Sequence, residues 1–140
     1  MSKIVADTNV LFSFFWKDSI TRKIITSNQF NIYSPEYAIT EILKYKQEII
    51  KKTKITSKEF NEQLTELKKI ILFIPKEEYA VLFKHTADKI KDKNDIDFIT
   101  LTYFLKTPLW SNDKELEFQN LVTIISTKEI ILKITENYNK

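Results

Sequence analysis

Two acidic residues, Asp7 and Asp113, each follow a short apolar run that is typical of a buried strand. The first run is Ile-Val-Ala at 4–6, and the second begins with Leu-Trp at 109–110. Ligands of open α/β sheets bind at the carboxyl ends of the strands, so we expect both carboxylates at one edge of a sheet. The chain contains no Cys and no Gly. These features predict an acidic site for a hard metal ion.

Predicted helices supply two further carboxylates. Glu41 falls in the second turn of a helix predicted over 35–52, on a face that also carries Ala38. Asp95 begins a helix predicted over 95–105, where the helix dipole favours a negative charge. We therefore expect both side chains to reach the cleft at the strand ends.

Each of these acids also has an ordinary structural role. Asp7, Asp95 and Asp113 could each cap the helix that follows it, and Asp is among the preferred N-cap residues. Glu41 could instead pair with Lys44 at the surface. Capping does not readily explain four acids that converge on one sheet edge, so their joint occurrence favours the metal site.

The composition excludes most other chemistry. Without Cys there is no disulfide, thiolate zinc site or iron–sulfur cluster, and the single histidine, His85, rules out a multi-histidine zinc site. Without Gly there is no P-loop or dinucleotide fingerprint. The net charge of +3 permits a nucleic-acid partner. Lysines cluster in two segments: Lys44, Lys46, Lys51, Lys52, Lys54 and Lys58, and then Lys89, Lys91 and Lys93.

The elements that must position these residues alternate along the chain. Strands are predicted over 3–7, 30–33, 70–74, 109–112 and 121–125, and helices over 9–16, 19–28, 35–52, 57–70, 77–91, 95–105 and 127–138. Ser19, Ser34, Thr56 and Ser126 are expected N-caps, with Asp18 the alternative to Ser19. Alternating strands and helices indicate parallel strands. We expect an α/β fold, a three-layer sandwich with a central parallel sheet of about five strands, as a single domain over 1–140.

The apolar stretches are interrupted by charges before they reach the roughly 20 residues that a membrane helix needs. The first residues show no charged-then-apolar leader. We therefore expect a cytoplasmic protein with no membrane association.

The acidic segments resemble the PIN domain, the metal-dependent ribonuclease fold of VapBC toxins and of RNA-processing nucleases. The resemblance covers essentially the whole chain. It rests on Asp-Thr-Asn-Val at 7–10, a Glu early in the third predicted helix, Asp-Ile-Asp-Phe-Ile-Thr-Leu at 95–101 and Leu-Trp-Ser-Asn-Asp-Lys at 109–114. The turn at 106–108, Lys-Thr-Pro, departs from the small or Gly-containing turn that the family often has.

The resemblance implies a role for each matching position. The acidic metal-binding quartet would be Asp7, Glu41, Asp95 and Asp113. Asn9 and Ser111 would be supporting polar residues that hold a carboxylate or a water. The family typically carries Mg²⁺ or Mn²⁺, and either one or two ions could bind. A cation would relieve the mutual repulsion of the carboxylates and could lower the pKa of a bound water beside a phosphodiester.

Three further acids lie near the quartet. Asp92 and Asp97 flank the third acidic position, where Asp95 fits the family spacing best. Glu117 follows Asp113 by one helical turn and could join as a further ligand.

The resemblance implies a metal-dependent endoribonuclease that hydrolyses RNA. The leading hypothesis is the toxin of a VapBC-type pair, with an antitoxin protein as partner and a homodimer as the expected assembly. The apolar segment 12–16 is a candidate contact surface. The alternatives are an RNA-processing PIN nuclease and a non-catalytic PIN-like module that binds RNA or protein. Arg22 is the only arginine, so RNA contacts must come mainly from lysines.

Overall fold

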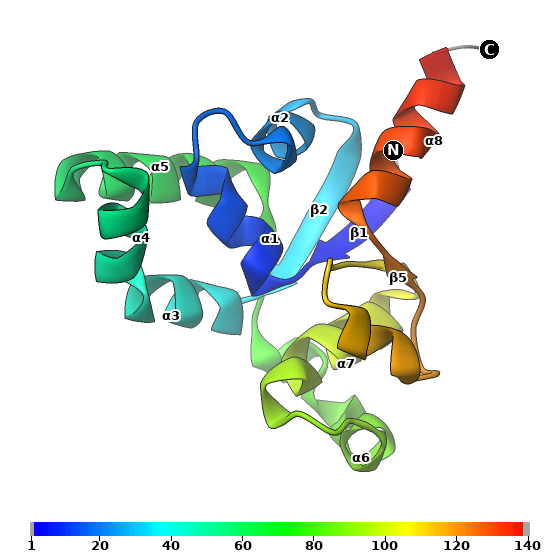
Figure 1. Cartoon of the computed structure of the whole chain (residues 1–140). Coiled ribbons are helices and arrows are strands. Elements are labelled where there is room, and N and C mark those ends of the chain that lie inside the picture. Colours follow the sequence, from blue (N-terminus) through cyan, green and yellow to red (C-terminus); the bar gives the residue numbers. More distant parts are fainter. Residues whose placement is uncertain (1, 139–140) are drawn as a thin grey trace.

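The computed structural model describes residues 2–138 and has a single parallel sheet at its centre (Figure 1). The sheet order is β3-β2-β1-β4-β5, and every pairing is parallel. The α/β fold with five parallel strands is thereby confirmed. The strands are β1 (Ser2–Ala6), β2 (Phe30–Pro35), β3 (Leu72–Ile74), β4 (Leu109–Trp110) and β5 (Ile124–Ile125).

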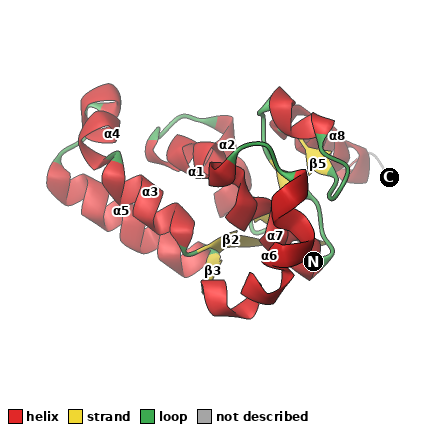
Figure 2. Cartoon of the chain, turned by 90° about the horizontal axis from the view of Figure 1, so that it is seen from below, coloured by secondary structure: helices red, strands yellow, loops and turns green. Residues whose placement is uncertain are grey.

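Helices cover the sheet, as Figures 1 and 2 show, and α7 packs against β1, β2 and β4. Among residues 2–138, no helix combines the length and the apolar character that spanning a membrane requires. The α-helices are α1 (Thr8–Phe12), α2 (Ile20–Thr26), α3 (Tyr37–Lys44), α4 (Lys46–Thr53), α5 (Ser57–Ile70), α6 (Phe83–Thr86), α7 (Ile96–Leu105) and α8 (Thr127–Tyr138). Short 3-10 helices are η1 (Ser13–Phe15), η2 (Lys76–Glu78), η3 (Ala80–Leu82), η4 (Ala87–Lys89), η5 (Lys93–Asp95) and η6 (Lys114–Phe118).

The register of the central strands aligns the ends of β1 and β4. Ala6 pairs with Trp110, and the N–H of Asp7 donates to the Trp110 carbonyl at 3.1 Å. The next strand continues this edge, because the N–H of Ser111 donates to the Ile125 carbonyl at 3.1 Å. The chain therefore leaves the carboxyl ends of two adjacent strands at Asp7 and at Ser111.

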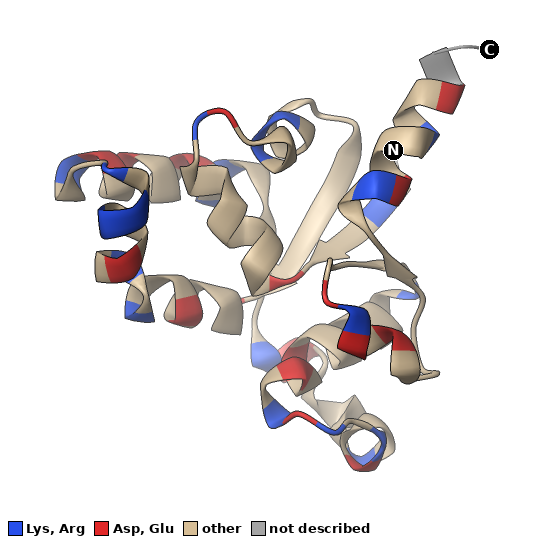
Figure 3. Ribbon diagram, viewed as in Figure 1, with Lys and Arg blue, Asp and Glu red and all other residues tan. Residues whose placement is uncertain are grey.

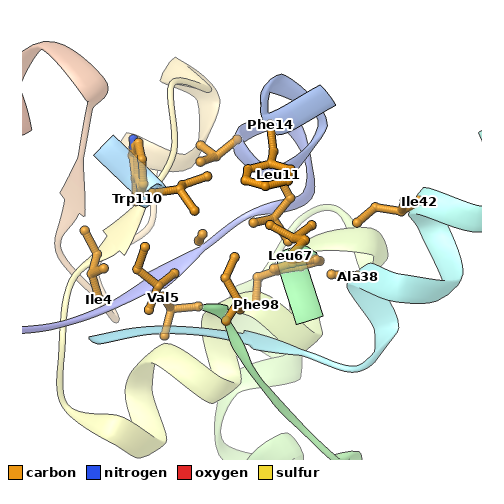
Figure 4. Packing of buried hydrophobic residues seen from close by; sticks show 14 of the residues in the cluster. Ile4, Val5, Leu11, Phe14, Ala38, Ile42, Leu67, Phe98 and Trp110 are labelled. Carbon is orange, nitrogen blue, oxygen red and sulfur yellow. The ribbon is translucent and has the colours of Figure 1, made fainter. Parts of the chain in front are cut away.

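One hydrophobic core holds the strands and helices together. Figure 4 shows how Val5, Leu11, Phe98 and Trp110 from separate elements meet in this core. The indole N–H of Trp110 donates to Thr127 Oγ1 at 2.9 Å, which satisfies its one polar group inside the protein. Because β1 and β4 are anchored in this way, the residues at their carboxyl ends have a rigid base.

Segment 12–16 contributes mainly to this core and not to the surface. Phe14 and Phe15 are fully buried, while Trp16 is partly exposed. Arg22 lies with its guanidinium 4.2 Å from the Phe14 ring centroid and donates to the Phe14 carbonyl. The only arginine is therefore a structural residue, and the segment offers less contact surface than the sequence suggests.

The predicted helix over 35–52 is wrong at its start and in its continuity. Ser34 and Pro35 belong to β2, because Ser34 Oγ donates to the Ala6 carbonyl at 2.9 Å and does not cap a helix. The helix begins after Glu36 and ends at Lys44, and α4 starts anew after Tyr45. The side chain that looked like a cap is used to link β2 to β1.

Two other predicted elements are shorter than expected. The helix predicted over 77–91 is instead a series of short turns from η2 to η4. The side chains of buried Tyr79 and Thr86 tie these turns to Asp97 and Thr100 of α7. The strand predicted over 121–125 reduces to β5. The Gln119 side chain binds the backbone of Leu121 and Val122, and so takes the place of strand pairing there.

Several capping predictions are confirmed. Thr56 and Glu59 form the expected reciprocal capping box at the start of α5. Ser19 caps α2 by accepting from the Arg22 N–H at 3.0 Å, so Ser19 takes this role and Asp18 does not. The chain has no Gly, and within residues 2–138 positive φ is found at Asn28, Lys54 and Lys106.

Candidate active site

Acidic residues from four separate segments line one small pocket of about 280 Å³ at the carboxyl edge of the sheet. We call it the acid pocket. Figure 3 shows acidic positions at the end of β1 and in the segments that face it. The acids that line it are Asp7, Glu41, Asp92, Asp95 and Asp113.

Asp7 lies at the bottom of this arrangement and is only 8% exposed. One carboxylate oxygen accepts from the Val10 N–H at 2.9 Å and caps α1, and Ser111 also hydrogen-bonds the carboxylate. Burial is the main reason that the pKa of Asp7 is raised from 3.8 to about 6; the hydrogen bonds oppose the shift, and Asp113 and Glu41 add to it. A carboxylate has two oxygens, so the capping role and a ligand role are compatible.

Glu41 is held in place by a residue next to Asp7. The Thr8 hydroxyl donates to Glu41 Oε1, and this bond joins α1 to α3. Burial raises the pKa of Glu41, the Thr8 hydrogen bond and Lys44 lower it, and nearby Asp97 and Asp92 raise it again. Glu41 lines the acid pocket from α3.

Asp95 precedes α7 and makes no capping hydrogen bond with its side chain. Burial raises its pKa to about 6, and the negative charges of Asp92, Asp113, Asp7 and Glu41 contribute further. The carboxylate of Asp92 accepts from the Asn94 N–H at 2.9 Å. The Asp95 carboxylate is therefore not used as a cap, and it lies close enough to the other four acids for their charges to raise its pKa.

Asp113 follows β4 and stays close to Ser111. The Asp113 N–H donates to Ser111 Oγ at 3.1 Å, and Asp113 Oδ1 accepts from the Glu115 N–H at 3.0 Å. Ser111 is 1% exposed. Its hydrogen bonds to Asp7 and Asp113 connect the end of β4 to both acids.

The remaining candidate residues divide into two groups. Asn9 lines the acid pocket with the quartet. Asp97 accepts a 2.7 Å hydrogen bond from the Tyr79 hydroxyl, and Glu117 is exposed on η6; neither lines the acid pocket. His85 is exposed and its Nε2 lies 3.0 Å from the Tyr103 hydroxyl, outside the pocket lining.

The donor set of the acid pocket suits a hard divalent cation. Every acid contributes carboxylate oxygens, which Mg²⁺ and Mn²⁺ prefer. The raised pKa values of Asp7 and Asp95 come partly from mutual repulsion, which a cation would relieve. Within residues 2–138, however, no three His, Cys, Asp or Glu side chains are arranged to hold an ion as they stand. The carboxylates therefore line one pocket, but they are not arranged in a complete metal-coordination geometry.

Two residues of the site were not expected from the sequence. Thr8 orients Glu41, and its position directly after Asp7 was the only signal available. Asn94 lines the acid pocket and accepts from the Tyr37 hydroxyl at 3.3 Å. Contacts of this kind depend on how α1, α3 and the segment before α7 are packed, which no local pattern shows.

Comparison with known proteins shows which family the sequence matches. Residues 5–135 match the family model described as PIN domain. A chain in the crystal structure of VapBC2 from Rickettsia felis, bound to a DNA fragment from their promoter, superposes with a TM-score of 0.61. The two chains are 12% identical, and the alignment covers 89% of this chain and 98% of that one, so the likeness concerns the fold. Among curated proteins, none matches the sequence at a significant level.

Proposed function

Because the chain belongs to the PIN domain family, whose members are nucleases, we propose that it is a metal-dependent endoribonuclease. The observation that carries this proposal is the acid pocket, where carboxylates from four segments converge beside two strand ends. Capping alone would need only one acid at each helix start, and would not gather Glu41 from the second turn of α3.

Asp7, Glu41, Asp95 and Asp113 are the residues that would hold Mg²⁺ or Mn²⁺, as one ion or two. Asn9 in the pocket lining and Ser111, which hydrogen-bonds Asp7 and Asp113, would support them. When bound, such an ion supplies charge stabilisation at a scissile phosphate and a water of lowered pKa. Asp92 is a further carboxylate in the pocket lining.

The protein's own side chains have distinct tasks in this scheme. Ser111 and the Val10 N–H fix the Asp7 carboxylate, and Thr8 fixes Glu41. Asp95 is uncapped and half-buried, so it can accept a hydrogen bond from an attacking water and orient it. Holding these groups before the substrate arrives reduces the cost of ordering them during the reaction.

The biological role that fits best is the toxin of a VapBC-type pair, acting in the cytoplasm with an antitoxin protein as its partner. The shared fold with a chain of a VapBC2 complex supports this proposal. A single domain over 1–140 belongs to the same proposal and is supported by the one sheet and core that the five strands share. A homodimer is the assembly we propose with it. An RNA-processing PIN nuclease is the alternative that the same fold also supports.

Cleavage of a labelled single-stranded RNA with Mg²⁺ or Mn²⁺ tests the proposal. We expect cleavage that stops in EDTA and is absent in Asp7→Asn. The matched control is Asp18→Asn, which removes an exposed carboxylate that lines neither the acid pocket nor the neighbouring hollow and should leave cleavage unchanged. Undiminished cleavage by Asp7→Asn would remove Asp7 from the mechanism. No cleavage by the unaltered protein with any RNA or metal would instead favour a non-catalytic module that binds RNA or protein.

A further inference from the structure

A second and larger hollow, of about 900 Å³, adjoins the acid pocket. The two share Asp92, Asp95 and Leu116 in their linings, so they lie side by side. We call the second hollow the lysine groove. Its other principal residues are Lys89, Ile90, Lys91 and Lys93 from the segment between α6 and α7, and Phe118 from η6.

The Phe118 side chain is exposed to solvent and does not pack into the hydrophobic core. Its side chain is 86% exposed, whereas Leu116 on the same short helix is 6% exposed. Helix η6 starts directly after Asp113, so Phe118 is carried on the element that continues from the acid pocket. An aromatic ring presented to solvent beside a nuclease site is suited to stacking against a base.

The three lysines give the groove an affinity for phosphate. Lys89, Lys91 and Lys93 are all exposed, and none of them takes part in an ion pair within residues 2–138. The carboxylates in the same lining are Asp92 and Asp95, at the border with the acid pocket, and Glu115. Figure 3 shows the alternation of basic and acidic positions along the segment before α7.

We propose that the lysine groove holds the RNA nucleotides next to the cleaved phosphodiester, with one base stacked on Phe118 and the phosphates against Lys89, Lys91 and Lys93. This inference rests on the proposed nuclease function of the adjoining acid pocket. A hollow of about 900 Å³ lies within the size range of ligand sites and is larger than one nucleotide requires. The exposed lysines favour a polyanion over an apolar peptide as the occupant.

Binding of a fluorescein-labelled 12-nucleotide single-stranded RNA, followed by anisotropy with Ca²⁺ as the cation, tests the groove separately from catalysis. Gels confirm that the RNA stays intact during the measurement. We expect Phe118→Ala to weaken binding by about 5- to 100-fold, because stacking contributes on this scale. Phe104→Ala, which removes a partly exposed ring at the other end of α7, is the matched control and should change binding less than twofold.

A set of RNAs, each lacking one base, identifies the stacked position. The unaltered protein should bind one or two of these RNAs more weakly than the complete RNA. Phe118→Ala should bind the same RNAs and the complete RNA with equal affinity, because this variant has no ring on which the base could stack. Equal sensitivity in both proteins would overturn the stacking role of Phe118.

The salt dependence of binding tests the lysines. Replacing Lys89, Lys91 and Lys93 together by Gln should reduce the slope of log K against log salt by about 2, or roughly 0.7 for each phosphate that a lysine no longer neutralises. The control replaces Lys23, Lys68 and Lys128, which are exposed on α2, α5 and α8 and do not line the groove, and it should leave more of the slope intact. Equal slopes for the two triple variants would overturn the proposal.

The outcomes separate this inference from the proposed function. If the unaltered protein cleaves RNA but both groove variants bind it normally, the groove proposal is wrong and the nuclease proposal stands. If the variants lose only the binding of a protein partner, the groove is a protein surface and the proposal is also wrong. If RNA binding follows the expected pattern but no metal supports cleavage, the groove is an RNA-binding site, the nuclease function fails, and the placement of the groove beside a cleaved phosphodiester fails with it.

Discussion

Asp7→Asn should make the metal-free protein more stable while it abolishes RNA cleavage. Burial, together with the smaller effects of Asp113 and Glu41, raises the pKa of Asp7 from 3.8 to about 6 in the folded protein. The folded state therefore binds this proton more tightly than the unfolded state does. The free energy of unfolding consequently falls as the pH rises from 3.8 to about 6, and the loss is complete at pH 7.

The size of the effect follows from the shift. A change of about 2 pKa units, at 1.36 kcal/mol for each, corresponds to a ceiling of about 3 kcal/mol at pH 7. Asn has no charge to bury, and its side-chain oxygen can still accept from the Val10 N–H, so the cap of α1 is kept. We therefore expect Asp7→Asn to raise the free energy of unfolding by about 1–3 kcal/mol in EDTA at pH 7. Asp7→Ala should gain less, because it loses the cap, which is worth about 1 kcal/mol.

Urea unfolding in EDTA at several pH values between 4 and 8 measures this difference. The gap between Asp7→Asn and the unaltered protein should open as the pH rises through about 5 and 6, and the exposed control Asp18→Asn should show no such gap. With Mn²⁺ present, the unaltered protein should recover stability by about 2.7 kcal/mol at a hundred times its Kd, and the variant should recover much less. If Asp7→Asn is less stable than the unaltered protein at pH 7 in EDTA, the burial argument for this carboxylate is wrong.

Three further predictions follow from contacts around the site and the turns. Thr8→Val keeps the shape of the side chain but removes the hydrogen bond to Glu41, so RNA cleavage should fall about tenfold in steady-state assays, and an unchanged rate would show that Glu41 does not need Thr8. Tyr79→Phe removes the 2.7 Å hydrogen bond to Asp97 and should lower the free energy of unfolding by about 1–2 kcal/mol in urea titrations; a decrease below about 0.3 kcal/mol would mean that the bond contributes nothing net. Lys106→Gly places the residue suited to positive φ at the end of α7, where φ is 55°, and should raise stability by about 1 kcal/mol, whereas a decrease would show that the Lys106 side chain stabilises this turn.

The positions of the two central strands and several of the helix caps were the most predictable parts of the fold. The apolar runs before Asp7 and Asp113 predict two buried strands, and parallel pairing brings their carboxyl ends together. β1 ends directly before Asp7, whereas β4 ends at Trp110 and is shorter than the strand predicted over 109–112. The capping box at Thr56 predicts the start of α5 correctly, because its hydrogen bonds join residues only three positions apart. Local chemistry decides these features, so the sequence alone is enough to predict them.

Tertiary contacts decided the features that the sequence did not predict. Ser34 is followed by Pro35 in a pattern typical of a helix start, yet its hydroxyl binds the Ala6 carbonyl in the neighbouring strand. Gln119 similarly takes over backbone groups that the strand pattern assigned to the sheet. In the site, no local pattern indicates that Thr8 holds Glu41, a residue 33 positions away. The order of the acids along the sequence indicated the pocket. Only the packed structure shows which carboxylates are fixed by hydrogen bonds and which residues donate them.

Crystals of the protein soaked in Mn²⁺ and measured at the manganese absorption edge give the most direct test of the central claim, that the acid pocket binds a divalent cation. We predict an anomalous peak about 2.1 Å from a carboxylate oxygen of Asp7, with oxygens of Asp95, Asp113 or Glu41 completing its contacts. Asp7→Asn crystals soaked in the same way should show a much weaker peak. A peak at another place on the surface, or none in the acid pocket at millimolar Mn²⁺, would contradict the account.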